Sequence, residues 1–231
     1  MTPIRVRESC MLRTANRNPG NQGFTLVELL IAIAVGSIVM AAVMTSFLSQ
    51  HNVYLAQDEV VQIQQSARVA MDMLTRDIHS AGYNPNHLAG GAGITTAGAT
   101  TLTFTRDDGT GILETITYTR SGANMLTLNI TPLPAGTTAA DWPANVAENI
   151  INLEFCYLMS SGNCILAPTA AQRPNIRSVQ VSIMAQAALM DTKSLPPVRT
   201  YTTPSGALWS STAGFRSRYF TTTVQCRNLG L

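Results

Sequence analysis

The sequence predicts an α+β protein in which one long N-terminal helix packs on an antiparallel β-sheet domain, as in a ladle. An apolar run near the N-terminus continues into a stretch with helical periodicity that ends near residue 83. Further along, short segments alternate apolar and polar residues, which is typical of strands with one buried face. We therefore expect three parts, at residues 1–23, 24–83 and 84–231.

The apolar run covers residues 24–43, and its 20 residues contain one formal charge, at Glu28. A helix rises ~1.5 Å per residue, so this run matches the ~30 Å hydrocarbon core of a bilayer. Residues 1–23 carry four Arg and one Glu, a bias that favours the cytoplasmic side of a membrane. The sequence thus predicts a single transmembrane helix with everything after it exported.

The helix is expected to continue beyond the membrane. Gly82 and Asn84-Pro85 mark its end, because glycine favours helix termination and proline cannot continue a helix. A break into two helices near residues 46–52 is the alternative, and no residue there requires it. Apolar residues before the end recur at steps of three or four and define one buried stripe: Ala56, Val60, Ile63, Ala67, Ala70, Leu74, Ile78 and Ala81.

The segment after the helix is predicted to form a β domain whose buried face is covered by the apolar stripe. Turn residues at 107–109 and 121–124 join the first three strands in a meander. Residues 87–100 are expected to form a flexible crossing, and 132–143 and 195–214 to form loops. The six predicted strands are Leu102–Arg106, Thr115–Arg120, Met125–Ile130, Ile150–Leu158, Val179–Ala185 and Tyr219–Cys226.

The segment Gly23-Phe24-Thr25-Leu26-Val27-Glu28-Leu29, after its basic leader, resembles the signal of type IV prepilins and type II secretion pseudopilins. The resemblance implies that a prepilin peptidase cleaves between Gly23 and Phe24 and methylates the new N-terminus at Phe24. It also implies that Glu28 pairs with the terminal amine of a neighbouring subunit in a fibre. A conventional signal peptide is the rival, but no small-residue cleavage site follows the apolar run.

Three further segments, 64–68, 76–83 and 221–229, resemble the PilW family of minor pilins and, more loosely, the J-type pseudopilins. Residues 87–145 show no such resemblance. The resemblance implies a minor pilin of a type IV pilus that primes assembly or joins a tip complex. Its implied partners are the prepilin peptidase and other minor and major pilins.

This resemblance also implies a location. The protein would first sit in the bacterial inner membrane, single-pass with its C-terminus in the periplasm, and later in the pilus at the cell surface. Two alternatives remain open. One is a J-type minor pseudopilin of a type II secretion system, and the other is a membrane-anchored periplasmic binding domain that does not polymerise.

Three cysteines remain once the leader with Cys10 is removed, namely Cys156, Cys164 and Cys226. An exported protein can oxidise them, and turn residues lie between Cys156 and Cys164. Closing this short loop would add ~2–3 kcal/mol by restricting the unfolded chain. The sequence favours a Cys156–Cys164 disulfide, with a Cys156–Cys226 bond or no intrachain bond as alternatives.

The remaining composition speaks against several other functions. The chain after residue 23 holds 11 basic and 12 acidic side chains and no basic stripe, so nucleic-acid binding is not indicated. His51, His79 and His87 lack metal-ligand spacing and are expected to be solvated. Asp107-Asp108-Gly109 fits a hairpin turn better than a cation site, because few other carboxylates lie nearby. We expect no enzymatic activity, metal or cofactor.

Overall fold

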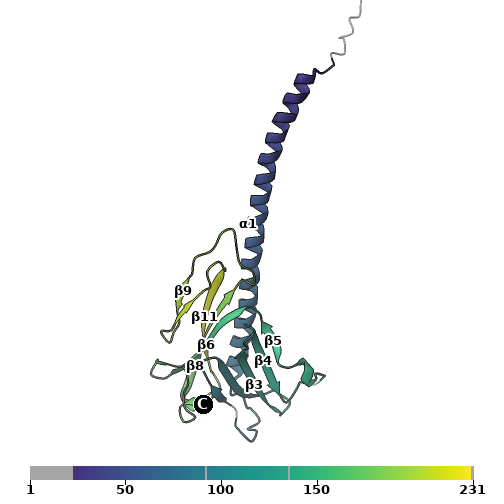
Figure 1. Cartoon of the computed structure of the whole chain (residues 1–231). Coiled ribbons are helices and arrows are strands. Elements are labelled where there is room, and N and C mark those ends of the chain that lie inside the picture. The colour runs from purple at the N-terminus through teal and green to yellow at the C-terminus, as the bar shows by residue number, and fades with distance from the viewer. Residues whose placement is uncertain (1–22, 92, 135, 230–231) are drawn as a thin grey trace, which may run out of the picture. The chain divides into compact units, whose positions relative to one another are not determined.

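The computed structural model describes residues 23–91, 93–134 and 136–229 (Figure 1). Most of the predicted leader, with Cys10, lies outside the described residues. The chain divides into two compact units, residues 1–51 and 52–231, which are described separately. We call them the N-terminal unit and the domain unit.

Helix α1 is a single helix from Leu26 to Ser80, so the alternative of a break near residues 46–52 is wrong. Within the N-terminal unit its side chains are exposed, including large apolar ones from Leu26 to Leu48. This stretch is long and apolar enough to cross a membrane. Among residues 23–51, no side chain covers this apolar surface, as expected of a segment that bilayer or other helices surround.

In the domain unit, one side of α1 is buried, as the periodicity predicts. Ala56 and Val60, at the start of the predicted stripe, are half-buried. The helix ends at Ser80, and Gly82 in the turn that follows has a φ of +83°, which favours glycine. A Cβ on Gly82 would lie 2.7 Å from Leu229 Cδ2, so the C-terminal segment also requires glycine there. The buried members of the stripe are Ile63, Ala67, Ala70, Leu74, Ile78 and Ala81.

The segment after β11 covers the end of α1. The Asn228 side-chain amide donates a hydrogen bond to the carbonyl oxygen of His79 at 3.1 Å. The His79 Nδ1 atom lies 2.9 Å from the carbonyl oxygen of Gln225. His79 is therefore half-buried against the chain, which corrects the prediction that it is simply solvated.

The first sheet has five antiparallel strands in sequence order. Its central strands form the predicted meander. Strand β1 corrects the prediction of a flexible crossing, because Ile94 and Ala97 are buried and pair with β2. The strand β5 also goes beyond the prediction and follows the 132–143 loop. The strands are β1 (Ile94–Ala97), β2 (Thr101–Asp107), β3 (Leu113–Arg120), β4 (Leu126–Thr131) and β5 (Ala144–Ala147).

The remaining strands form a four-stranded antiparallel sheet in the order β11-β8-β6-β7 and a separate two-stranded ribbon. The prediction of one sheet is thus refined to two main sheets. The ribbon lies within the predicted loop 195–214, which is therefore only partly irregular. The strands are β6 (Ile150–Met159), β7 (Cys164–Ile165), β8 (Ile176–Gln186), β9 (Thr200–Thr202), β10 (Leu208–Ser210) and β11 (Ser217–Gln225). Two short 3₁₀ turns occupy Ala139–Asp141 and Arg173–Asn175.

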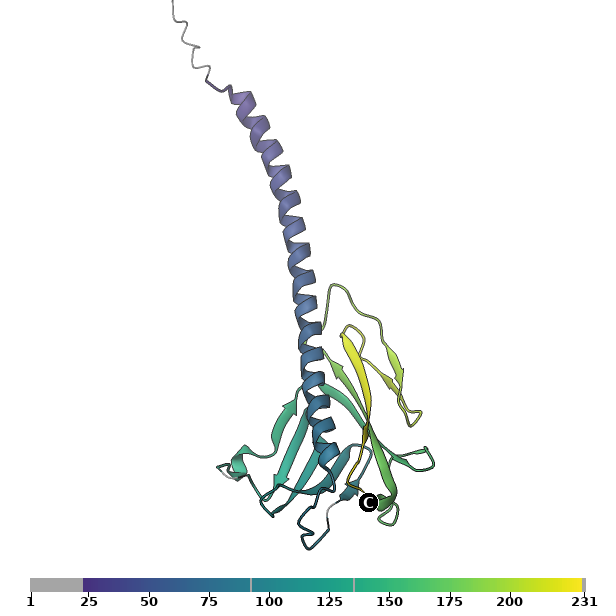
Figure 2. The ribbon, with the colours of Figure 1, turned by 180° about the vertical axis from the view of Figure 1, so that it is seen from behind.

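Both main sheets contribute to one core beneath the buried stripe of α1 (Figure 2). Phe104 and Ile116 come from the first sheet, and Phe155 and Val181 from the second. All four are fully buried. The predicted α+β class, with a long helix packed on antiparallel sheets, is confirmed.

A polar cluster interrupts this core where α1 crosses the first sheet. Asp77 is only 4% exposed, and the Tyr118 hydroxyl donates to its Oδ2 at 2.6 Å. The Arg106 guanidinium donates to Asp77 Oδ1 at 3.3 Å and to Glu114 at 3.3 Å. Burial and the adjacent Asp77 carboxylate raise the pKa of the Tyr118 phenol above its usual range. Through Asp77, these hydrogen bonds hold α1 against β2 and β3.

Candidate processing and assembly site

Thr25 and Glu28 form a reciprocal cap at the start of α1. Glu28 Oε2 accepts hydrogen bonds from the Thr25 backbone N–H and hydroxyl, both at 3.1 Å. The Glu28 backbone N–H donates to Thr25 Oγ1 at 3.2 Å. Thr25 precedes the first helical residue and Glu28 is the third, which is the spacing of a capping box. The Glu28 carboxylate therefore satisfies one free N–H group at the helix start, and the Thr25 hydroxyl satisfies a second.

The cap leaves part of the Glu28 carboxylate available. Both bonds from Thr25 go to Oε2, and no donor among the described residues reaches Oε1. The carboxylate also lies in the first turn, where the helix dipole favours negative charge. The side chain is thus held in one position with one oxygen open to an outside cation.

The predicted cleavage site lies directly before this cap. Gly23 and Phe24 precede the helix without regular structure, and Phe24 is 89% exposed. Among the residues that the structure describes, and apart from the neighbours of Gly23 in the chain, no atom lies within 4 Å of the position that a Gly23 Cβ would occupy. The peptide bond between them is open to an approaching enzyme, and Phe24 contributes no packing that cleavage would disturb. Gly23, Phe24 and Glu28 lie within residues 23–28, so no tertiary contact is needed to bring them together.

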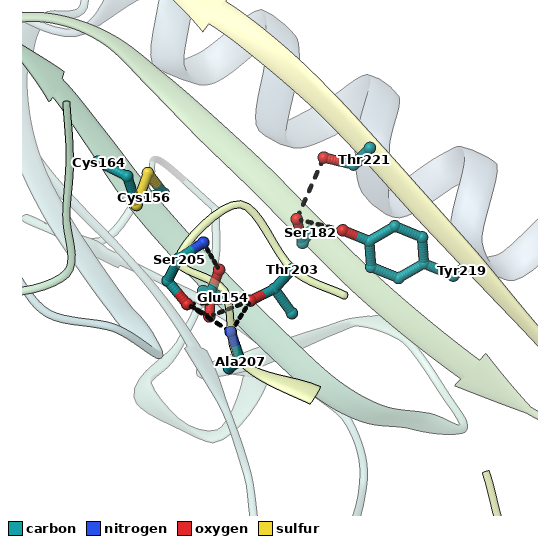
Figure 3. The surroundings of a disulfide bond; sticks show 9 residues. All are labelled: Glu154, Cys156, Cys164, Ser182, Thr203, Ser205, Ala207, Tyr219 and Thr221. Carbon is teal, nitrogen blue, oxygen red and sulfur yellow. Dashed lines mark hydrogen bonds between the residues drawn. A yellow bond between two sulfur atoms is a disulfide. The ribbon is translucent and has the colours of Figure 1, made fainter. Parts of the chain in front are cut away.

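The second sheet brings two of the cysteines, Cys156 and Cys164, together (Figure 3). Cys156 on β6 and Cys164 on β7 form a disulfide, with 5.4 Å between their Cα atoms. Cys226 is buried and free. It follows β11, and β8 separates β11 from β6, so the alternative Cys156–Cys226 bond does not occur. Burial raises the pKa of the Cys226 thiol to about 12.

This arrangement predicts a large difference in thiol reactivity between the folded and unfolded protein. The thiolate is the nucleophile, and a pKa near 12 keeps Cys226 protonated at pH 8. Cys226 in the folded protein should resist iodoacetamide and react only after denaturation. Peptide mapping without reductant should show Cys156 linked to Cys164. Rapid alkylation of Cys226 in the folded state, or its linkage to Cys156, would contradict the structure.

A second buried carboxylate, Glu154 on β6, holds the β9–β10 ribbon against the second sheet (Figure 3). It accepts hydrogen bonds from the hydroxyls of Ser205 at 2.7 Å and Thr203 at 3.1 Å. Tyr201 of the ribbon stacks on Tyr219 with ring centroids 5.3 Å apart. The ribbon is thus fixed by local packing. Sequence reasoning gave no sign of Glu154, which lies inside a predicted strand.

The turn after β2 uses its carboxylates internally, as expected of a turn. Asp107 Oδ1 accepts the backbone N–H of Gly109 at 2.8 Å, and Asp108 Oδ1 accepts that of Thr110 at 2.7 Å. Among the described residues no group of three or more His, Cys, Asp or Glu side chains is placed to hold a metal ion.

Comparison with known proteins supports a class for the chain. A family model described as the prokaryotic N-terminal methylation motif matches residues 18–44. Among solved structures, the chain is similar to a type IV-like pilin from Thermus thermophilus, with a TM-score of 0.55 and 12% sequence identity. The similarity covers 74% of this chain and 98% of that one. Comparison with curated proteins found no match.

The fold is therefore that of a type IV pilin-like protein, and the motif lies where that fold begins its long helix. Together they support the type IV pilin superfamily. The narrower resemblance to the PilW family stays a prediction.

Proposed function

We propose that this protein is a minor pilin of a type IV pilus that primes assembly or belongs to a tip complex. The observation that carries the proposal is the methylation motif over residues 18–44 at the start of an exposed apolar helix. The other half of that helix packs one side on a pilin-like domain, which suits a subunit that exchanges bilayer for neighbouring helices. The proposed role is structural rather than enzymatic.

Each site residue has a separate proposed task. Residues 1–23 act as the leader, and the prepilin peptidase cuts after Gly23 and methylates Phe24. Residues 24–43 then hold the chain in the inner membrane with the domain in the periplasm. During assembly, the open Oε1 of Glu28 takes the methylated amine of Phe24 from a neighbouring subunit, while Thr25 keeps the carboxylate in position. A charge pair of this kind is strong where water is excluded.

A J-type pseudopilin of a type II secretion system is the second candidate. The same motif and fold support this candidate too, because neither distinguishes a pilus from a secretion pseudopilus. Deleting the gene would separate the two: loss of surface fibres supports the pilin role, and loss of protein export supports the pseudopilin role. If the protein is instead a binding domain that never polymerises, deleting the gene should cause neither loss. That reading also gives Glu28 no partner.

The proposal predicts the N-terminus of the mature protein. In cells with an intact prepilin peptidase, the chain should begin at Phe24 and carry one methyl group on its amine. In cells lacking the peptidase, the same chain should keep residues 1–23. Intact-mass and N-terminal peptide analysis of membrane fractions measures both. An N-terminus beyond residue 40 would indicate a conventional signal peptide, and an unprocessed wild-type chain would reject the proposed processing.

A further inference from the structure

Strand β11 differs from the other edge strands of the sheets in the described chain. Those strands are short: β1 and β5 have four residues each, β7 has two, and the ribbon strands have three. The pairings of β1 and β5 each contain a register shift, whereas all nine residues of β11 pair with β8 without one. Proteins usually shorten, bulge or charge an edge strand, because its free backbone groups attract further strands. The long, regular edge of β11 lacks these protections.

The register shows which backbone groups of β11 face away from β8. Just beyond the two ends of the strand, the Cys226 N–H donates to the carbonyl oxygen of Arg177, and the Ala187 N–H donates to that of Arg216. Because hydrogen-bonded pairs alternate along an antiparallel ladder, the even-numbered residues of β11 bond to β8 and the odd-numbered residues point outward. The carbonyl oxygen of Gln225, an odd-numbered residue, accordingly meets the end of α1 instead.

Three successive outward positions have free backbone groups. Within the described part of the chain, the N–H and C=O groups of Tyr219, Thr221 and Thr223 have no hydrogen-bond partner. Thr221 and Thr223 are exposed, and Tyr219 is half-buried because its ring stacks on Tyr201 of the ribbon. A further strand laid along this edge would satisfy the outward groups as β8 satisfies the inward ones.

A groove of about 510 Å³ lies beside this edge. Its lining residues are Arg68 and Met71 of α1 and Tyr219, Phe220 and Thr221 of β11. This part of α1 lies beside β11 in both views of the ribbon (Figures 1 and 2). No residue of β8 lines the groove, so it opens on the outward side of β11. The free backbone groups therefore border a space that a peptide can enter.

Arg68 is the charged residue of this groove. It is exposed, and it forms no ion pair with any residue that the structure describes. Asp72, one turn further along α1, neither lines the groove nor pairs with Arg68. An incoming strand with a carboxylate at this point would complement the groove in charge.

We propose that β11 binds an extended strand of another protein by strand addition, and that this strand places a carboxylate beside Arg68. Main-chain hydrogen bonds to Tyr219, Thr221 and Thr223 supply the affinity, and the carboxylate favours one kind of strand over others. A second copy of this chain is disfavoured, because its own β11 edge brings a second Arg68 beside the first. The inference does not depend on cleavage, methylation or Glu28, so its failure is distinguishable from failure of the proposed function.

Selection of short peptides on the full chain in detergent tests the proposal. The probe is a displayed library of random nine-residue peptides, the length of β11. Enriched peptides should contain Asp or Glu, and Arg68→Glu should weaken their binding about fivefold. Lys193→Glu is the control, because Lys193 is exposed and does not line the groove. Failure to enrich acidic peptides, or equal effects of the two variants, would overturn the proposal.

Two variants at position 221 test the backbone contact. Thr221→Pro removes an outward N–H and no bond to β8, so the sheet keeps its ladder. Binding of the selected peptide should fall at least about tenfold, because one main-chain hydrogen bond is lost. Thr221→Val is the matched control: it keeps the N–H, loses only the hydroxyl contact with Ser182, and should bind as the unchanged chain does. Peptide binding that survives Thr221→Pro would contradict strand addition.

Amide exchange of the unchanged chain, resolved by residue, gives a readout that needs no variant. Bound peptide should slow the amides of Tyr219, Thr221 and Thr223 at least about tenfold, whereas those of Phe220 and Thr222, already bonded to β8, should change little. Peptide binding without this alternation would overturn the proposal. Protection of the outward amides without peptide, rising with protein concentration, would also overturn it, because a second copy would then cover the edge.

Discussion

Replacing Glu28 by leucine should reduce incorporation into fibres at least about tenfold, while the chain still inserts, is cleaved and folds. Truncating one partner of a buried interfacial charge pair costs about 2–5 kcal/mol, and the membrane-like interior of a fibre screens charge poorly. The domain unit does not depend on this side chain, because Glu28 contacts only Thr25 among the described residues. Immunoblots of sheared fibres against membranes measure the ratio.

The cap formed with Thr25 allows charge to be separated from helix capping. Glutamine also serves in a capping box, so Glu28→Gln keeps the cap and loses the charge. Thr25→Ala keeps the charge and loses the hydroxyl bonds of the cap, while the backbone N–H of residue 25 can still hold the carboxylate. We expect Glu28→Gln to be as defective as Glu28→Leu, Thr25→Ala to assemble well, and Glu28→Asp to be intermediate because its arm is shorter. Wild-type assembly of Glu28→Gln would show that the cap, and not the charge pair, is what the fibre requires.

Replacing Asp77 by alanine should cost about 3 kcal/mol of unfolding free energy, which is the lower end of the range for breaking a buried charge pair. The lower end applies because the Arg106 side chain is 24% exposed and keeps Glu114 as a partner. The Tyr118 hydroxyl, in contrast, is left without its acceptor in the core. Tyr118→Phe should cost less, about 1–2 kcal/mol, since it removes only the donor.

Denaturant unfolding of the mature chain in detergent, followed by circular dichroism, measures these differences. Asp72→Ala is the matched control, because Asp72 is an exposed acid on the same helix and should change stability by less than about 0.5 kcal/mol. Equal losses for Asp72→Ala and Asp77→Ala would contradict the cluster. The raised pKa of Tyr118 means that the fold favours the neutral phenol. Its contribution should therefore be lost as the pH rises above about 10, and Tyr118→Phe should weaken that dependence.

The elements that the sequence predicted are those with a continuous pattern. Helix α1 and the longer strands each hold a repeated spacing over several turns or residue pairs, so tertiary contacts were not needed to recognise them. Strands β1 and β5 have four residues each, and β9 and β10 three, which is too short for a period to show. Alternation also reports which face is buried but not which strand lies beside which. The division into two sheets therefore had no sequence signal.

The site residues differ in the same way. Gly23, Phe24 and Glu28 belong to one contiguous motif, so the sequence alone shows that they lie close together. The burial of Asp77 could have been inferred from its spacing, although a search for apolar residues leaves it out. Asp77 is three residues after Leu74 and four before Ala81, both on the buried face. Glu154 had none, because its partners Thr203 and Ser205 follow about fifty residues later in an irregular segment.

The contact between the C-terminal segment and the end of α1 sets an order of events during folding. The hydrogen bonds of His79 with Gln225 and Asn228 join residues 146 and 149 positions apart. Contacts so distant in sequence form late, because the intervening chain must first be in place. Helix α1 can therefore form well before the segment that covers its end. Until residues 225–229 are in place, the unfinished domain exposes apolar surface to aggregation and proteolysis.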